Sequence, residues 1–275
     1  MINFVNDYSE GAHEKILERL MATNREKTCG YGDDYYCEIA AEKIKKACGR
    51  DDAQVYFLAG GTQSNMMVID TMTAPYEGVV ACESGHVNVH EAGAIEFSGH
   101  KVLTVPSREG KIDAADLSEL IEVFYGDENH EHMVYPGIVY ISHPTEIGTL
   151  YTLKELTDIS VICREHHIPL FLDGARLGYG LAAEGTDVTL KDIAGLTDVF
   201  YVGGTKVGAL YGEALVFTHG NMPVRFNTRV KQHGAMLAKG RILGLQFDTL
   251  FTDNLYYELG ANGIAQAKKI KEALT

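Results

Sequence analysis

Short apolar segments alternate with helix-like stretches along most of this chain, and the alternation restricts the possible folds more than any single motif. Strands arranged in this rhythm form mainly parallel sheets, because each connection returns across a face of the sheet. The expected strands are residues 55–58, 78–82, 101–105, 137–141, 169–173, 198–202 and 213–217. Helical periodicity is clearest over residues 38–47, 63–72, 115–124, 153–166 and 234–250. We therefore predict an α/β fold in three layers, with a mainly parallel seven-stranded sheet between helices.

Charge and cysteine content limit the classes of partner. Lys and Arg number 24 against 38 Asp and Glu, and the resulting net charge of −14 opposes binding to nucleic acid or to an anionic membrane. Five cysteines without a CxxC pair or metal-ligand spacing indicate reduced thiols and a cytoplasmic protein. No apolar stretch approaches the ~18 residues of a membrane span. We expect a small-molecule substrate, and we interpret the polar, histidine-containing segment 126–132 as a solvated loop.

Lys206 lies between two apolar strand candidates, in the small-residue segment 203–208. Burial lowers the pKa of an ammonium group, and the neutral amine can then form an imine with an aldehyde. Earlier in the chain, Asp173 ends another strand candidate, where a buried carboxylate could hold a protonated ring nitrogen. Each residue alone has a simpler explanation, as a loop lysine that reaches solvent or as the N-cap of a helix at 175–177. Together they predict a pyridoxal phosphate site.

A glycine-rich segment follows the first strand candidate. Gly60, Gly61 and Thr62 lead directly into a helical stretch, so that glycine backbone, helix N–H groups and a hydroxyl could surround a phosphate. The segment matches neither the GxGxxG dinucleotide motif nor the P-loop, which argues against a nicotinamide dehydrogenase. Alone, such a segment is most often a turn and a helix cap.

Two histidines follow the second strand candidate. His86 lies where the carboxyl end of a parallel strand meets a ligand crevice, and it could stack on a cofactor ring. The alternative is a histidine in a polar loop. His90 comes four residues later, but no third ligand has a convincing metal spacing. We expect His86 to face the cofactor and His90 to be structural, with no metal.

With these motifs in this order, the chain resembles the threonine aldolase branch of the aromatic amino acid β-eliminating lyase/threonine aldolase family. The resemblance runs from about Asn6 to the last residue, and its most specific segments are 171–176 (FLDGAR) and 203–206 (GGTK), with 31–34 (YGDD) and 85–94 also matching. It implies the fold of pyridoxal-phosphate-dependent enzymes of fold type I, the aspartate aminotransferase type. It also implies a cytoplasmic lyase of amino acid metabolism.

The resemblance gives each matching residue a role. Lys206 would carry the Schiff base, Asp173 would hold the pyridine nitrogen, and Arg176 would bind the substrate carboxylate or the cofactor's phenolic oxygen. The residues implied at the rest of the cofactor are Gly61, Thr62 and Asn65 at the phosphate, His86 on the ring and Thr205 beside the lysine. Further implied positions are Asn6 near the substrate carboxylate, Tyr31 in the neighbouring subunit's site, His143 near the substrate β-hydroxyl, and Lys231 as a cation for the phosphate.

The implied reaction is retro-aldol cleavage of L-threonine or L-allo-threonine to glycine and acetaldehyde, in which His86 or His143 takes the β-hydroxyl proton. Another pyridoxal phosphate reaction, such as β-elimination or racemisation, would use the same motifs. A catalytically silent protein of this fold is the alternative from a different class. We expect an N-terminal segment at 1–20, a large cofactor-binding domain at 21–250, and the start of a small, incomplete C-terminal domain at 251–275. The resemblance also implies a homodimer or homotetramer with shared active sites.

Overall fold

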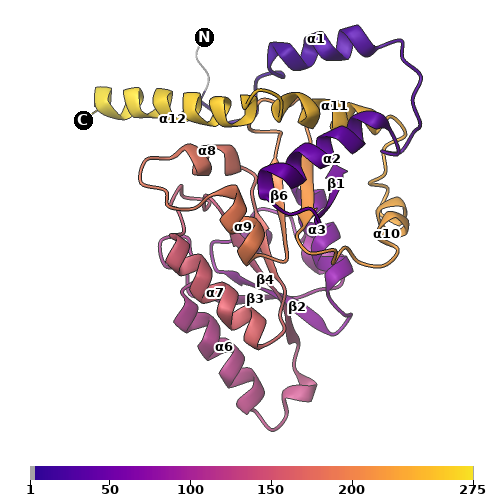
Figure 1. Cartoon of the computed structure of the whole chain (residues 1–275). Coiled ribbons are helices and arrows are strands. Elements are labelled where there is room, and N and C mark those ends of the chain that lie inside the picture. Colours follow the sequence, from indigo (N-terminus) through magenta and orange to yellow (C-terminus); the bar gives the residue numbers. More distant parts are fainter. Residues whose placement is uncertain (1–3, 275) are drawn as a thin grey trace.

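The computed structural model describes residues 4–274, which form a seven-stranded sheet with helices on both faces (Figure 1). The strands are β1 (Gln54–Leu58), β2 (Glu77–Cys82), β3 (Val102–Val105), β4 (Tyr135–Ser142), β5 (Leu170–Asp173), β6 (Val199–Gly203) and β7 (Glu213–Phe217). Their order across the sheet is β1-β7-β6-β5-β4-β2-β3. All seven expected strands are present, and five of them form a parallel block from β6 to β3, so the predicted sheet is confirmed.

Strand β7 runs antiparallel to both of its neighbours, which the sequence does not predict. Glu213 at its start is in register with Gly203 at the end of β6 and with Leu58 at the end of β1. The connection from β6 to β7 spans only residues 204–212, which is too short for the crossover that a parallel pair needs. The amino end of β7 therefore lies at the same edge of the sheet as the carboxyl ends of β1 and β6.

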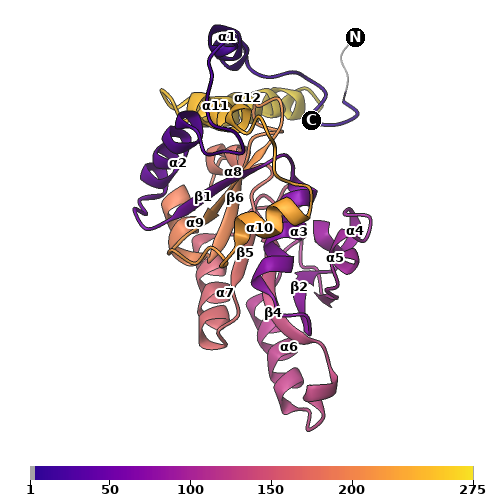
Figure 2. The same ribbon diagram turned by 90° about the vertical axis from the view of Figure 1, so that its right-hand side faces the viewer.

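The helices form two layers, one on each face of the sheet (Figure 1 and Figure 2). They are α1 (Glu14–Thr23), α2 (Tyr35–Cys48), α3 (Gly61–Met72), α4 (His86–Val89), α5 (Ala94–Phe97), α6 (Ala114–Gly126), α7 (Leu153–Glu165), α8 (Leu177–Ala182), α9 (Leu190–Leu196), α10 (Phe226–Gln232), α11 (Arg241–Leu250) and α12 (Leu255–Leu274), with a 3-10 turn η1 (His130–His132). Side chains of α2, α6, α7 and α9 pack on one face, and those of α3, α5 and α10 pack on the other. Asp34 caps α2 and Thr152 forms a capping box with Glu155 in α7, so these starts are encoded locally.

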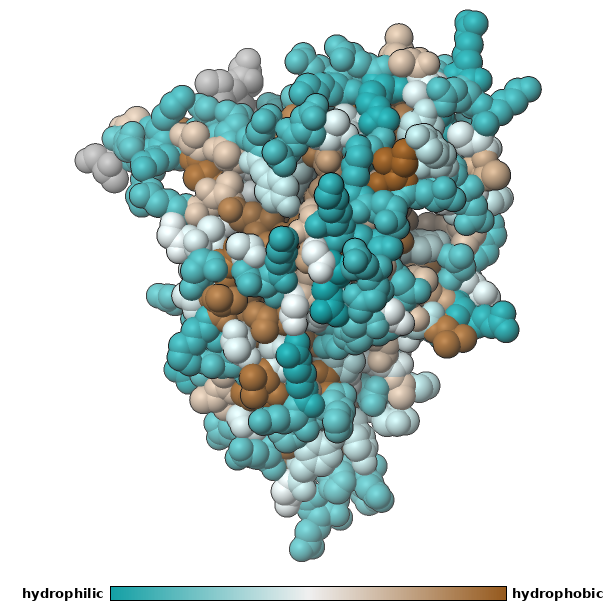
Figure 3. Space-filling model, in the orientation of Figure 1, coloured by the Kyte–Doolittle hydropathy of each residue, from teal (hydrophilic) through white to brown (hydrophobic). Residues whose placement is uncertain are grey.

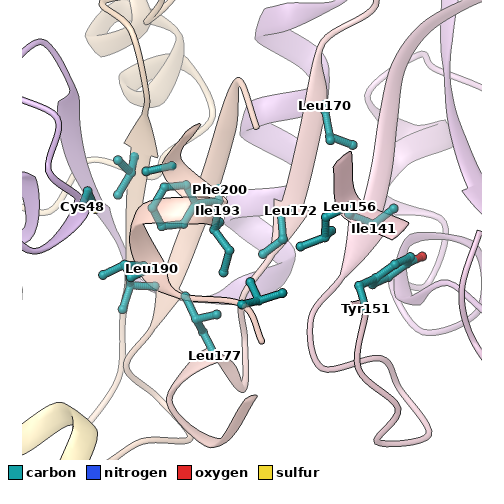
Figure 4. Packing of buried hydrophobic residues seen from close by; sticks show 14 of the residues in the cluster. Cys48, Ile141, Tyr151, Leu156, Leu170, Leu172, Leu177, Leu190, Ile193 and Phe200 are labelled. Carbon is teal, nitrogen blue, oxygen red and sulfur yellow. The ribbon is translucent and has the colours of Figure 1, made fainter. Parts of the chain in front are cut away.

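Successive side chains of the central strands enter two different cores. Leu170 and Leu172 of β5 belong to the core under α7 and α9, whereas Phe171 belongs to the core under α3. Figure 4 shows the first core, where Leu172 lies near Leu156 of α7 and Ile193 of α9 lies near Phe200 of β6. Burial on both faces explains why the strands are almost continuously apolar. The outer surface seen in Figure 3 is mainly hydrophilic, with scattered apolar residues.

One expected helix is shorter than predicted. The periodicity suggested a helix over 234–250, but α11 begins only at Arg241. Gly234 has a φ of +67°, a left-handed conformation that ends a helix, and it follows directly after α10 and its C-cap. The carbonyl of Ala238 accepts a hydrogen bond from the Tyr31 N–H at 3.2 Å, so this backbone group serves a distant segment. The apolar side chains of 234–240 therefore belong to a loop.

Helix α12 crosses α8 at the carboxyl end of the described chain (Figure 1). Tyr256 Oη accepts a hydrogen bond from the Gly178 N–H at 3.0 Å and donates to the Gly203 carbonyl at 3.1 Å. The first turns of α12 thus pack against the end of β6. The boundaries expected at residues 20 and 250 stay predictions, and residues 1–3 and 275 of the outer two segments lie outside the described range. Within residues 4–274, no helix has the length and apolar character needed to cross a membrane.

Candidate active site

A cavity of about 390 Å³ opens at the edge of the sheet where β1, β4, β5 and β6 end and β7 begins. Ligands of α/β proteins bind at the carboxyl ends of parallel strands, and the volume suits a small molecule. The predicted site residues that line it are Gly61, Thr62, Asn65, His86, Asp173, Arg176, Thr205 and Lys206. Unpredicted lining residues include Tyr8, Glu91, Ser142, Glu146, Tyr201, Tyr211 and Glu213. Residues far apart in the sequence thus meet in one cavity, as their positions at the ends of the expected strands predicted.

Asp173 is the last residue of β5, and its buried carboxylate is held from three sides. Oδ2 accepts hydrogen bonds from Tyr140 Oη at 2.7 Å and from Asn65 Nδ2 at 3.1 Å, and Oδ1 accepts from the Ala175 N–H at 2.9 Å. Burial, and then the charge of Asp173, raise the pKa of Tyr140, so this phenol remains a donor at neutral pH. The carboxylate therefore has a fixed orientation in the cavity wall.

Lys206 follows β6 in the short connection to β7. Among the described residues, its Nζ has no hydrogen bond or ion pair within the chain. The main chain around it is held firmly, because its carbonyl accepts a hydrogen bond from Tyr179 Oη at 2.5 Å. Two glycines allow this connection to approach β5 closely. A Cβ at Gly203 would lie 2.3 Å from the Ala175 carbonyl, and one at Gly174 would lie 2.0 Å from the Tyr201 carbonyl. The site thus presents an unpaired amine on a fixed backbone.

Glu213, the first residue of β7, holds the backbone of the β6–β7 connection that contains Lys206. It was not predicted as a site residue. It is 3% exposed, and its two oxygens accept hydrogen bonds from the Gly204 N–H at 3.0 Å and from Thr205 Oγ1 at 2.8 Å. Burial raises the pKa of Glu213 to about 8, against the opposing effect of these two hydrogen bonds. The sequence signal was present, since an acid at the start of an apolar strand requires a buried partner.

Helix α3 points its N-terminus into the cavity. Its N-cap is Gly60, in an extended conformation and without a side-chain cap, so the N–H groups of Gly61 and Thr62 are available to a ligand. The 12-residue helix also places its positive end there. The role of this helix start as a phosphate cradle stays a prediction.

Asn65 lines the cavity beside Gly61 and Thr62, and its side chain contacts two acids. Its Nδ2 donates to Asp173 and, at 2.8 Å, to Glu91 Oε1, so its amide joins two buried carboxylates. Both amide hydrogens are used in these two contacts, and the expected contact of this side chain with the phosphate stays a prediction. Partners this remote in the sequence leave no local signal.

His86 begins α4 at the rim of the cavity, and Glu91 holds its ring. Nδ1 lies 2.8 Å from Glu91 Oε1, and this hydrogen bond raises the pKa of His86 despite the opposing effect of burial. Burial also acts to raise the pKa of Glu91, but hydrogen bonds from His86, Thr62 and Asn65 together lower it. His90, expected to be structural, lines the same cavity, with its ring centroid 5.6 Å from that of His86.

The structure corrects the expectation for His143. Its side chain is completely buried, does not line the cavity, and has neither ring nitrogen hydrogen-bonded within the described chain. Burial lowers its pKa to about 4. The reason is the alternation of side chains at the end of β4, which turns Ser142 toward the cavity and the next residue away from it. Glu146, in the loop that follows, lines the cavity instead.

Arg176 reaches the cavity from the turn after β5, and Asp7 occupies its guanidinium. Burial acts to raise the pKa of Asp7, but the hydrogen bond and charge of Arg176, with the charge of Lys206, lower it overall. Asn6 does not line the cavity, and its Oδ1 accepts hydrogen bonds from the Tyr8 N–H at 3.0 Å and from Ser9 Oγ at 2.8 Å. Asn6 thus shapes the turn that brings its neighbours to the site.

Tyr31 and Lys231 lie outside this cavity. The Lys231 Nζ is 4.7 Å from the centroid of the Tyr31 ring, which is half exposed on the surface. Their expected roles in a partner's site stay predictions. Among residues 4–274, no group of His, Cys, Asp and Glu has the geometry of a metal site.

The fold and this cavity define an α/β enzyme with a lysine, Lys206, in the wall of its cavity. The chain belongs to the β-eliminating lyase family, whose model matches residues 4–272. A threonine aldolase from Leishmania major has a similar structure, with a TM-score of 0.94 and 46% identity over 98% of this chain and 78% of that one. A low specificity L-threonine aldolase from Pseudomonas sp. is 32% identical over 268 residues, 96% of this chain and 76% of its own length.

More distant structures share the fold alone. An aspartate aminotransferase from Thermus thermophilus superposes with a TM-score of 0.73 at 15% identity, over 97% of this chain and 68% of that one. The chain therefore has the pyridoxal-phosphate-dependent fold of type I that its motifs implied.

Proposed function

We propose that the chain is a pyridoxal-phosphate-dependent threonine aldolase, which cleaves L-threonine and L-allo-threonine to glycine and acetaldehyde. One observation carries the proposal. The unpaired amine of Lys206, the buried carboxylate of Asp173 and the open N-terminus of α3 converge on one cavity. The likeness to two threonine aldolases supports this reaction over others of the family.

The residues present fit pyridoxal phosphate. The Gly61 and Thr62 N–H groups at the start of α3 suit a phosphate, and the oriented carboxylate of Asp173 suits a protonated ring nitrogen. Lys206 supplies the amine for the covalent bond, and His86 lies at the rim where it can cover a ring face. When bound there, the cofactor would supply an electron sink for the bonds at the substrate α-carbon.

The chain's own residues would then orient the substrate and manage its protons. Arg176 lies in the cavity wall, three residues after Asp173 in the sequence. Its guanidinium suits a bidentate contact with the substrate carboxylate. That contact requires an exchange of partners, because Asp7 now occupies the guanidinium. Glu213 keeps the Lys206 backbone fixed, so that the amine can leave and return without loss of position.

The oligomer is a further part of the proposal. Tyr31 and Lys231 form an exposed cation–π pair away from the chain's own cavity, which suits a contribution to the site of a second copy in a homodimer or homotetramer. A cytoplasmic location is proposed as well, on the basis of the five unpaired cysteines. Sedimentation of the holoprotein measures the oligomeric state. A weaker cofactor affinity in Lys231→Ala or Tyr31→Ala would support the shared site.

The reaction is tested by incubating the purified protein with pyridoxal phosphate and L-threonine, L-allo-threonine or L-serine. Equal amounts of glycine and acetaldehyde from threonine support the aldolase. Formation of 2-oxobutyrate and ammonia from threonine would instead indicate β-elimination. Formation of D-allo-threonine from L-threonine, or loss of optical activity by L-serine, without cleavage would indicate racemisation. Absence of any product, with the cofactor bound, would favour the silent protein.

A further inference from the structure

Glu146 enters the active-site cavity from the loop after β4, between the buried strand end and the rim. Its Oε1 accepts two hydrogen bonds, from Ser142 Oγ at 2.6 Å and from the His86 N–H at 2.9 Å. These two donors come from different elements, β4 and α4, so the carboxylate is fixed from both sides. The side chain lines the same cavity as Lys206 and Asp173.

The second oxygen of this carboxylate lacks a partner. Glu146 Oε2 is shielded from solvent and accepts no hydrogen bond within the described chain. A buried acceptor without a donor costs about 1–3 kcal/mol, and such groups in native proteins call for an explanation. Because the residue borders a ligand cavity, a donor on a bound ligand is the direct explanation.

A line of hydroxyl groups connects Glu146 to the carboxylate at the other side of the cavity. Ser142 Oγ lies 3.2 Å from Tyr140 Oη, which donates to Asp173 at 2.7 Å. Ser142 and Tyr140 are two residues apart on β4, so they project to the same face of the sheet. The strand therefore sets the position of Glu146 relative to the group expected at the cofactor's ring nitrogen.

The other candidates for a base are less suited. His143 is buried away from the cavity, with its pKa lowered to about 4. His86 has one ring nitrogen hydrogen-bonded to Glu91 at 2.8 Å, so only its other ring nitrogen is left to face a substrate.

We propose that Glu146 is the catalytic base for the substrate β-hydroxyl and the group that selects β-hydroxy amino acids. The inference rests on the proposed aldolase function. Oε2 accepts the hydroxyl hydrogen and takes that proton as the Cα–Cβ bond breaks. The electron pair of the substrate's O–H bond forms the second bond of the aldehyde carbonyl. The electron pair of the broken Cα–Cβ bond stays on Cα. A proton delivered to Cα completes glycine, and Glu146 returns its proton to the medium, so no other reactant is needed.

Glycine separates this role from a structural one, because it has no β-hydroxyl. In the holoprotein, Glu146→Gln should lower kcat for L-threonine cleavage by about 100-fold or more, the usual contribution of a general base. Its Kd for glycine, measured by calorimetry, and the exchange of glycine's α-hydrogen in D2O should change less than about threefold. The matched control is Glu83→Gln, an exposed acid before α4 that does not line the cavity, and it should leave every readout unchanged.

Chemical rescue gives a second measurement. In Glu146→Ala, added formate should restore part of the threonine cleavage, because the small carboxylate can occupy the vacated space. Absence of rescue in a variant that still binds glycine would count against Glu146 as the base.

Full cleavage of threonine by Glu146→Gln would overturn the assignment of Glu146 while leaving the aldolase function intact. A wild-type protein that exchanges glycine's α-hydrogen but does not cleave threonine would instead refute the aldolase itself. Loss of glycine exchange and binding in Glu146→Gln would show a structural residue.

Discussion

Arg176 donates two hydrogen bonds to the carboxylate of Asp7, from Nε to Oδ2 at 2.5 Å and from Nη2 to Oδ1 at 3.2 Å. The N-terminal segment therefore places a carboxylate on the one guanidinium in the cavity wall of the described chain. Both side chains are only about a third exposed, at 37% and 36%. A substrate carboxylate and Asp7 would thus compete for the same fork of N–H groups.

Asp7→Asn should strengthen the binding of glycine to the holoprotein. Removing the competing charge frees the guanidinium, and a pair at this exposure is worth about 0.5–1 kcal/mol, or ~2–5-fold in Kd. Calorimetry of glycine binding measures the change. Asp158→Asn, which breaks the exposed surface pair with Lys154, is the control and should leave Kd unaltered. Weaker binding by Asp7→Asn would mean that Asp7 positions the guanidinium and does not compete for it.

Lys206→Ala should abolish both covalent attachment of the cofactor and turnover. Loss of a group that forms the covalent intermediate typically costs more than about a thousandfold in kcat. Borohydride reduction followed by mass spectrometry should find the cofactor fixed to the wild-type chain and not to the variant. Lys154→Ala, at an exposed surface position of α7, leaves the Lys206 amine in place and should retain the fixed cofactor. A variant lacking Lys206 that still turned over threonine at the wild-type rate would refute the site.

Glu91→Gln should lower the pKa of His86 in the cofactor-free protein. The hydrogen bond to Glu91 is the main cause of the raised value, and the amide cannot stabilise an imidazolium in the same way. A group with a raised folded-state pKa stabilises the fold below its ordinary value, here 6.5, and loses this contribution as pH rises through the raised value. Glu91 has a lowered pKa, so its contribution is present above its ordinary 4.5 and is lost as pH falls through the lowered value. The variant's deficit in stability should therefore be largest between pH 4.5 and 6.5.

NMR titration of the His86 ring, assigned by its loss in His86→Asn, measures this change directly. Glu131→Gln, in the exposed turn η1, provides the control and should not move the His86 titration. An unchanged His86 pKa in Glu91→Gln would show that another group holds the ring.

The strands and the placement of the site followed from the sequence because each depends on local information. Apolar runs gave the strands, and the carboxyl ends of parallel strands converge whatever lies between them, so Asp173 and Lys206 could be predicted to meet. Orientation at a strand end could not be predicted in the same way. A shift of one residue at the end of β4 exchanges His143 for Ser142 at the cavity, and only the register with β5 fixes it.

Side-chain partners from remote segments were also beyond local reasoning. Asn65 contacts Asp173 across 108 residues and Glu91 across 26, and neither contact leaves a pattern near Asn65 itself. The late start of α11 also depends on a remote partner. Ala238, in the segment expected to form its first turns, accepts a hydrogen bond from the Tyr31 N–H. Glu213 was recognisable from the sequence as an acid in an apolar strand. Its hydrogen-bond partners, Gly204 and Thr205, were not, because the sequence did not predict that β7 runs antiparallel to β6.

Glu213→Gln should change how the stability of the cofactor-free protein depends on pH. Burial raises the pKa of Glu213 to about 8 from an ordinary 4.5, so between these values the folded state holds a proton that the unfolded state releases. The free energy of unfolding of the wild type should therefore fall with rising pH, by at most about 1.4 kcal/mol per pH unit from this group. Gln lacks the titration, and its stability relative to wild type should improve from pH 5 to 8. Urea unfolding of both proteins and of Glu258→Gln, an exposed control, measures the slopes; parallel curves for all three would contradict the buried titration.

Gly260→Ala should destabilise the packing of α12 on α8. A Cβ at this position would lie 2.0 Å from the carbonyl oxygen of Gly178, and backbone cannot move aside as a flexible side chain can. Overpacking of this kind costs about 1–3 kcal/mol. Gly195→Ala in α9 is the matched control, because its Cβ would meet nothing within 4 Å and alanine favours helix by up to about 1 kcal/mol. Thermal unfolding should therefore show a lowered Tm for the first variant and an equal or raised Tm for the second. Equal Tm values for Gly260→Ala and wild type would mean that α12 can shift away from α8 without loss, and that its contact with the end of β6 through Tyr256 is what holds it in place.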